Sequence, residues 1–416
     1  MLELIRLELK KICRRKLTII VTLSCLLATT LFFTLPYLQY KAWDENGKML
    51  SMREAVSYKK SCYEKISGSL TEERITADLH KYQALFQDEK NLIKERGGEV
   101  TFNDTLYYGY IAPQSSYLGL LGENYCNLNE SLGYDKIPQI SLSEGAKFYE
   151  TRNSKVNEII NSSYFDGKKY TAAEKAFWLK RKAEIKEPYN YGYVLGWSNF
   201  GDTAQMLIIC IFGICIVVAP VFSNEYQTGT AAVILSTRYG KSKIVWAKII
   251  TATLFGTVIF AMNAFISLAI PLITFGIEGG DLPLQIMNMT VPYALTFSDA
   301  AYIMIGIGYL VMLGLLSITL LFSARMRSSF TVLIIDVLLV FLPIFLGLSG
   351  SNHLWNQLLR LLPYQALSGL SLFKEYISYP FGGIILSLYA MIAIVYASIS
   401  LLSLPFAGRS FSRYQA

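Results

Sequence analysis

The sequence predicts an all-α polytopic membrane protein with six transmembrane helices and a mainly helical extracellular domain. Of its 416 residues, 53% are hydrophobic and only 17% are charged, whereas soluble domains carry about 25% charged residues. The apolar residues gather in long runs near both ends of the chain, and the polar segment 39–200 separates the first run from the others. A chain this apolar could not cover its surface with polar groups, so a soluble enzyme is excluded.

Six apolar runs reach the ~20 residues that a helix needs to cross the hydrocarbon core. They are 17–38, 203–223, 244–275, 300–323, 330–349 and 382–405. The first run follows a basic start, but it is longer than the apolar part of a signal peptide and no small-residue cleavage site follows it, so we expect a retained span. The third run contains Pro271, which predicts a bend toward its outer end.

Basic residues predict the orientation. In the short loops and termini, 14 Lys or Arg residues fall on the side that holds both termini, against only Arg360 and Lys374 on the other side. The positive-inside rule therefore places the segment 1–16 and the tail 406–416 in the cytoplasm. The segment 39–200 carries 22 basic and 22 acidic residues, so the net charge of +7 comes from the membrane part. We interpret these basic residues as setting the orientation in the membrane and contacting anionic lipid, and not as binding nucleic acid.

The segment 39–200 is large enough for a core of its own. Amphipathic patterns predict helices at 49–66 and 142–160, whereas 102–140 is rich in Gly, Tyr, Asn and Pro and gives no assignment. No strand period is evident. Sixteen of the 28 tyrosines lie in 39–200, which suits either an amphipathic ligand surface or ordinary packing. Two residue pairs have the spacing of a capping box at a helix start: Ser69 with Glu72, and Thr171 with Glu174.

The six cysteines do not form a disulfide framework. Cys62 and Cys126 both lie in 39–200 and could pair, but their spacing does not decide the question. The sequence has no CxxC motif, and His80 and His353 are its only histidines. We therefore predict neither a metal site nor a catalytic residue in this chain.

Two segments outside the spans are amphipathic. The segment 1–16 is predicted to form an interfacial helix in the inner headgroup layer. The segment 352–378 is too apolar for a free loop, and Pro363 divides it. We predict an outer re-entrant helical hairpin there. Apolar residues share one face of the first helix: Leu2, Ile5, Leu9 and Ile12.

The loop 224–243 connects the second and third spans. Its sequence predicts a short helix from Glu225 to about Leu235, a turn around Tyr239-Gly240 and a basic entry into the next span. Glu225 directly follows a bilayer exit and lies near a predicted helix N-terminus, where a carboxylate is favoured. The alternative interpretation is a solvated loop whose basic residues only follow the positive-inside rule.

Together these features resemble the permease subunits of ATP-binding-cassette exporters of the type II (ABC-2-like) class. The resemblance covers the chain apart from the insert 39–200, and it implies that loop 224–243 is a cytoplasmic coupling loop that docks on a separate ATPase. The family pattern matches Glu225, Gly229, Thr230, Arg238 and Lys248. The predicted ATPase-coupling set is Glu225, Tyr226, Thr228, Gly229, Thr230, Leu235 and Arg238.

The chain itself is not predicted to bind ATP. Gly240-Lys241-Ser242 resembles the end of a P-loop, but Leu235 stands where that motif needs glycine. We expect no cofactor in this chain and Mg-ATP on the partner. The resemblance implies cytoplasmic ATPase subunits, a second permease that is identical or paralogous, and membrane lipid as partners, with no nucleic acid. The expected location is the bacterial cell membrane.

Two functional hypotheses follow. The first is ATP-driven export of an amphipathic or lipophilic substrate such as a peptide, antibiotic or lipid. The alternative is an ATPase-coupled sensor or resistance module that binds an antimicrobial peptide or cell-wall precursor on its extracellular domain without net transport. Polar side chains inside spans are costly in lipid, so Asn263 and Asp336 are intramembrane candidates for substrate contact or structural pairing.

Overall fold

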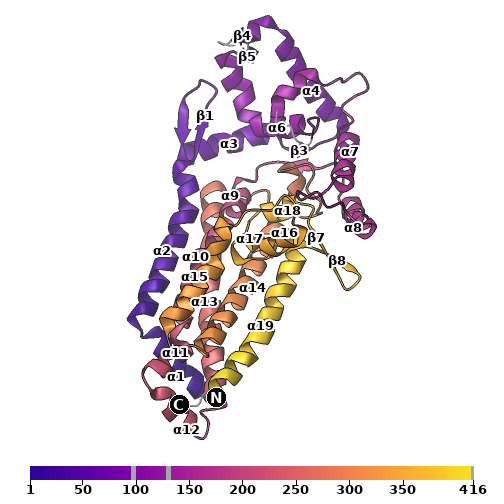
Figure 1. Cartoon of the computed structure of the whole chain (residues 1–416). Coiled ribbons are helices and arrows are strands. Elements are labelled where there is room, and N and C mark those ends of the chain that lie inside the picture. The colour runs from indigo at the N-terminus through magenta and orange to yellow at the C-terminus, as the bar shows by residue number, and fades with distance from the viewer. Residues whose placement is uncertain (95–99, 128–132, 414–416) are drawn as a thin grey trace.

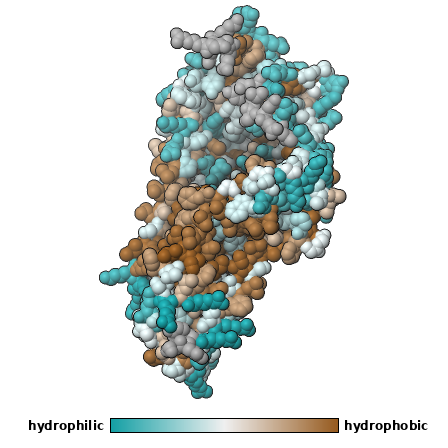
Figure 2. Space-filling view, viewed as in Figure 1, coloured by the Kyte–Doolittle hydropathy of each residue, from teal (hydrophilic) through white to brown (hydrophobic). Residues whose placement is uncertain are grey.

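The computed structural model describes residues 1–94, 100–127 and 133–413, and it shows an elongated helical bundle with a polar domain at one end (Figure 1). The first residues of the chain and the last turns of its final helix lie together at the opposite end. An apolar belt separates two polar ends on the face shown in Figure 2. This distribution fits a protein whose middle is surrounded by lipid.

Among the described residues, five helices are long and apolar enough to cross a membrane. They are α2 (Lys16–Gln39), the run Leu195–Gln227, α13 (Lys243–Phe275), α14 (Phe297–Ser323) and α19 (Leu388–Ser412). The second of these consists of α9 (Leu195–Thr203), the 3-10 turn η5 (Ala204–Met206), α10 (Leu207–Val218) and α11 (Pro220–Gln227). The predicted spans 17–38, 203–223, 244–275 and 300–323 all lie within these helices.

The predicted span at 330–349 is a shorter apolar helix, so the count of six spans is not confirmed. It comprises α15 (Ser329–Phe341) and the 3-10 turn η7 (Leu342–Phe345), after which the chain is irregular. Pro343 lies in the first turn of this 3-10 segment, where a proline fits because its nitrogen has no hydrogen to donate. At its start, the Ser329 hydroxyl lies 2.8 Å from that of Ser223.

The predicted last span at 382–405 is displaced along the chain. Residues 378–387 instead form an antiparallel hairpin of β7 (Ser378–Phe381) and β8 (Ile384–Ser387), with Gly382 and Gly383 in the turn at φ +55° and +85°. Positive φ at both turn positions favours Gly-Gly. The helix α19 begins at Leu388 and continues to Ser412, so most of the predicted tail 406–416 is helical; 414–416 lie outside the described residues.

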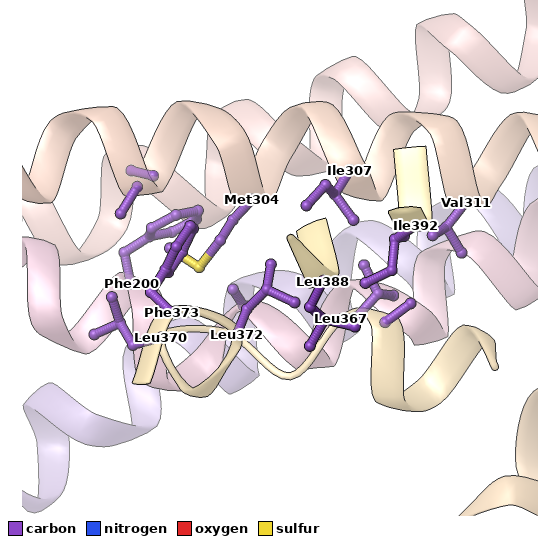
Figure 3. Close-up of a cluster of buried hydrophobic side chains, with 14 of the residues drawn as sticks. Phe200, Met304, Ile307, Val311, Leu367, Leu370, Leu372, Phe373, Leu388 and Ile392 are labelled. Atoms are coloured by element: carbon purple, nitrogen blue, oxygen red, sulfur yellow. The ribbon is translucent and has the colours of Figure 1, made fainter. Parts of the chain in front are cut away.

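The predicted hairpin segment 352–378 contains three short helices. They are α16 (His353–Arg360), α17 (Pro363–Ala366) and α18 (Ser371–Lys374). Figure 3 shows buried apolar side chains of this segment beside those of α14, including Leu367, Leu372 and Phe373 near Met304 and Ile307. This packing fixes the segment on the bundle near the polar domain. Its position relative to a membrane stays a prediction.

The polar domain is mainly helical, as predicted, but it also contains short strands. Its helices include α3 (Met52–Ile66), α4 (Glu72–Gln87), α6 (Ser115–Glu123), α7 (Phe148–Asn161) and α8 (Ala172–Ala183). Its antiparallel pairs are β1 (Lys41–Trp43) with β2 (Met49–Ser51), β3 (Gly68–Ser69) with β6 (Asn190–Tyr191), and β4 (Leu92–Lys94) with β5 (Val100–Phe102). Strands of two or three residues are too short for an alternating pattern to reveal them.

The segment 102–140, which the sequence left unassigned, is mainly helical where it is described. Besides α6 it contains α5 (Asp104–Leu106), the π-turn η2 (Tyr107–Ile111) and the 3-10 turns η3 (Ala112–Gln114) and η4 (Gly133–Gln139). Residues 128–132 lie outside the described part. Cys62 and Cys126 are both buried free thiols, so the structure contains no disulfide between them.

One of the two predicted capping boxes is present. Thr171 and Glu174 bond reciprocally at the start of α8, which confirms that prediction. The Ser69–Glu72 box is wrong, because Thr71 caps α4 by accepting from the backbone N–H of Arg74 at 3.3 Å. The Glu72 carboxylate instead accepts from two backbone N–H groups in the first turn of α7, at 3.0 and 2.9 Å, so it joins α4 to α7.

Candidate coupling site

The loop after the second long helix contains two helical segments rather than one. Glu225 lies in the last turn of α11, the chain turns at Gly229, and α12 (Thr230–Ser236) follows. The predicted single helix from Glu225 to Leu235 is therefore wrong. Gly229 has φ +70°, a left-handed conformation that ends helices and that glycine adopts without a steric penalty.

Glu225 is buried, with 2% of its surface exposed. One carboxylate oxygen accepts from the Lys248 ammonium of α13 at 2.7 Å and also from Lys11 of α1 (Leu2–Cys13). The other accepts from the hydroxyl of Thr230, the first residue of α12. Glu225 therefore faces the inside of the bundle rather than an open surface. A buried carboxylate needs such partners because leaving it unpaired is very costly.

Lys248 is the most buried cation of this site. Its surface is 1% exposed, and its ammonium also donates to the Glu8 carboxylate of α1 at 3.0 Å. Glu8, Lys11, Glu225 and Lys248 together form what we call the ionic cluster. It ties α1, α11 and α13 together, and through Thr230 it holds the start of α12.

A third cation adjoins the cluster. Arg15 precedes α2, and one of its terminal nitrogens is buried without a hydrogen-bond partner among the described residues. Burial lowers the pKa of Arg15, and the negative charges of Glu225 and Glu8 oppose that shift. With Arg15, the cluster has three cations against two carboxylates.

Serine 323 fixes α11 to the end of α14. Its hydroxyl accepts from the backbone N–H groups of Phe222 and Ser223 at 3.0 and 3.1 Å and donates to the carbonyl of Ala219 at 2.6 Å. The Tyr226 hydroxyl donates to the carbonyl of Ala324 at 2.7 Å. We call this set of bonds the Ser323 clamp. It links the predicted coupling loop to a second long helix.

The structure divides the predicted coupling set by exposure. Glu225 and Leu235 are buried and Tyr226 is half-buried, so these three face the bundle. Four others are exposed: Thr228, Gly229, Thr230 and Arg238. Val233 on α12 is 67% exposed, although sequence reasoning did not select it. Single exposed apolar residues are common on protein surfaces, so Val233 adds to the exposed part of this loop without by itself marking a docking site.

The sequence indicated only part of the ionic cluster. Lys248 matched the family pattern, but the pattern did not indicate that Lys248 is buried and pairs with Glu225. Glu8 and Lys11 were missed, because they pair with residues more than 200 positions away and no local pattern reports such a contact. Only the apolar face of α1 indicated this contact in the sequence, because such a face must pack against another part of the molecule or against lipid.

The two intramembrane candidates both pair with other polar groups. Asn263 of α13 accepts from Thr29 of α2 at 2.7 Å and donates to the carbonyl of Ile259 at 2.8 Å. Asp336 of α15 accepts from Thr319 of α14 at 2.9 Å, and its second oxygen has no partner among the described residues. Both side chains are completely buried, so they join neighbouring helices.

The long apolar helices define a multi-pass membrane protein, and buried polar contacts hold the loop between the second and third of them to the bundle. A family model described as ABC-2 family transporter protein matches residues 2–380. The chain therefore belongs to the ABC-2 family transporters, and it is a membrane permease rather than an enzyme. No curated protein and no solved structure matches it significantly. Over the described residues, no group of three or more His, Cys, Asp or Glu side chains could hold a metal ion.

Proposed function

We propose that this chain is the permease subunit of an ATP-driven exporter of an amphipathic or lipophilic substrate. In this proposal both termini are cytoplasmic, α15 is the sixth span, and the polar domain between α2 and α9 is extracellular. The excess of basic residues at the termini and at the α11–α13 loop supports that orientation. The expected partners are cytoplasmic ATPases that carry Mg-ATP, a second permease and membrane lipid.

The observation that carries the proposal is the way the ionic cluster fastens the coupling loop. Glu225 is bonded at once to α1, to α13 and to the first residue of α12. The Ser323 clamp adds α14. A force on α12 would therefore reach several long helices together, which is what a rigid-body change between inward-open and outward-open states requires.

The docking surface in this proposal is the exposed face of α12 and its flanks, with Val233 and Arg238 at its centre. Val233→Asp and Arg238→Glu should each abolish co-purification with the ATPase while membrane insertion stays intact. Arg413→Glu is the matched control, because Arg413 is exposed at the same end of the bundle but lies outside the loop. Unchanged co-purification of both loop variants would end the coupling assignment.

The alternative function, sensing without transport, is favoured by one observation. Two adjoining cavities lie where the polar domain meets the long helices, so a ligand there could act on the bundle without crossing it. Reconstitution with the ATPase in liposomes separates the two functions. Accumulation of substrate across the membrane supports export, whereas ligand-stimulated ATP hydrolysis without flux supports sensing.

A further inference from the structure

The first cavity lies at the junction of the polar domain and the bundle. It has a volume of about 480 Å³, within the range of small-molecule sites. The polar domain contributes α6, and the bundle contributes the first turns of α9 and α14. The lining residues that matter here are Gly119, Leu120 and Glu123 on α6, Leu195 and Ser198 on α9, and Phe297 on α14.

A second cavity of about 320 Å³ adjoins the first, and Tyr191 and Gly192 line both. Its other walls are α3 and the loop between α13 and α14. The Tyr63 and Tyr191 rings stack between the two cavities with centroids 5.7 Å apart. The boundary between the cavities is therefore aromatic.

The charged lining of the two cavities is mainly acidic. Lys60 pairs with Glu278 at 2.7 Å, whereas Glu64, Glu123 and Asp281 form no ion pair within the described parts of the chain. Lys155 donates to the carbonyl of Glu123 rather than to its carboxylate. Three residues with carboxylates outside any ion pair thus line the cavities, which favours a cationic ligand.

An aromatic side chain of the second cavity already contacts one cation. The Lys60 ammonium already lies 5.4 Å from the centre of the Tyr193 ring, and Tyr193 packs edge-on against Tyr63 at 5.5 Å. A tyrosine face attracts a cation through its quadrupole. The first cavity adds apolar walls from Leu120, Leu195 and Phe297.

We propose that the two cavities form one binding site for a small cationic amphiphile, meaning an ammonium-type or phosphonium-type cation on an apolar body. The apolar body lies in the first cavity against α6, α9 and α14. The cation lies in the second cavity, which Glu64 and Asp281 line. This inference names the substrate class of the proposed transporter, and only its link to transport rests on that proposed function.

The position of the site gives it a route to the coupling loop. Its walls include the first turns of α9 and α14, and both helical runs end at the Ser323 clamp beside Glu225. A ligand that draws α6 toward α9 and α14 would act on the same two helices that the clamp joins at their other ends. Binding and the state of the loop would then be linked reciprocally.

Binding is tested on the full chain in lipid nanodiscs, without the ATPase. The probes are tetraphenylphosphonium and tetraphenylborate, which have the same shape and opposite charges. Equilibrium dialysis measures each, with uptake by empty nanodiscs subtracted. We expect saturable binding of the phosphonium and binding of the borate that is weaker by about tenfold or more, because the lining carboxylates and tyrosine faces discriminate by charge.

Two variants test the location. A Cβ at Gly119 meets nothing within 4 Å, and Gly119 lines the first cavity, so the ring of Gly119→Phe should occupy that cavity and abolish saturable binding. Gly109→Phe is its control, because Gly109 has equally open surroundings but does not line either cavity. Glu64→Gln combined with Asp281→Asn should weaken phosphonium binding by about tenfold. Glu45→Gln combined with Glu158→Gln removes the same charge elsewhere and should change nothing.

The outcomes separate this proposal from the coupling assignment. Phosphonium uptake that does not saturate, or that Gly119→Phe leaves unchanged, is partition into lipid only and overturns the site. Equal binding of the borate and the phosphonium overturns the cationic class. Loss of ATPase association in the α12 variants has no bearing on these measurements, since the ATPase is absent from them.

Discussion

Lys248 and Lys11 donate to the same oxygen of Glu225, but in different surroundings. The Lys248 side chain is 1% exposed and that of Lys11 is 42% exposed. Removing one partner of a buried ion pair costs about 3–5 kcal/mol, whereas an exposed ion pair contributes roughly 0–1 kcal/mol. The two lysines should therefore differ in what they contribute to the stability of the bundle.

The comparison gives the first prediction. Lys248→Met should lower the free energy of unfolding by about 3 kcal/mol because it leaves Glu225 and Glu8 less well paired, and Lys11→Met should lower it by no more than about 1 kcal/mol. Thermal or denaturant unfolding of the purified chain in detergent measures both. Equal losses in the two variants would contradict the buried position of Lys248.

The conformation of Gly229 gives the second prediction. A Cβ there would meet no neighbouring atom within 4 Å, but the backbone has φ +70°. Gly229→Val should therefore weaken the turn before α12 by about 1–2 kcal/mol through backbone strain alone, whereas Gly229→Asn should be tolerated better. Hydrogen exchange of the amides of α12 would report the difference. Similar exchange in both variants would show that the turn does not depend on this conformation.

At the scale of elements, the polar domain is held to the bundle by a few buried polar groups. Glu174 at the start of α8 accepts hydrogen bonds from Tyr164 at 2.9 Å and from Ser378 of β7 at 3.1 Å. Arg152 of α7 is 1% exposed and donates to the carbonyl of Met289 in the α13–α14 loop at 3.0 Å. These contacts join segments that lie far apart in the sequence.

The contact through Glu174 should depend on pH. Burial alone would raise the pKa of Glu174, but hydrogen bonds from Thr171, Tyr164 and Ser378 hold the pKa below its ordinary value. A carboxylate with a lowered pKa in the folded state adds stability above the pKa of the unfolded chain, about 4.3, and loses it as the pH falls further. Asp166, which binds Asn356 and His353, has a lowered pKa and acts in the same direction.

The third prediction follows from that sign. Hydrogen exchange in β7 and in the first turn of α8 should rise as the pH falls below about 4, after correction for the intrinsic rates. Glu174→Gln should flatten this dependence at β7, whereas Glu45→Gln, an exposed control, should not. A flat profile in the unmodified chain would mean that Glu174 does not fasten the polar domain.

At the scale of the whole molecule, local composition predicted the long helices, because a membrane-crossing helix needs only a sufficient run of apolar residues. The ends of the helices were less predictable. The last span was predicted to begin too early, because it included the apolar residues of β8. The second long helix begins at Leu195, eight residues before the predicted start at 203. A run of apolar residues does not distinguish lipid contact from packing against another domain.

The candidate site was predictable only in part, for a related reason. The sequence indicated Glu225, Gly229 and Lys248 through a pattern within one loop and its exit. It did not indicate that Glu225 is buried, because that depends on Glu8 and Lys11 from α1. The cavities beside Tyr191 were equally hidden, since their walls come from α3, α6, α9 and α14.

The last prediction concerns the orientation of the molecule in the membrane. Ser67 is exposed in the polar domain and Ser236 is exposed at the end of α12, near opposite ends of the bundle. In a chain whose native exposed thiol is removed by Cys13→Ser, Ser67→Cys should react with a membrane-impermeant maleimide on intact cells. Ser236→Cys should react only after the cells are opened, as should Ser410→Cys near the end of α19.

The positive-inside rule requires this result, because the basic residues cluster at the end that holds Ser236. Labelling of Ser236→Cys on intact cells would place the ionic cluster outside, where no ATPase could reach α12, and it would overturn both the orientation and the coupling proposal.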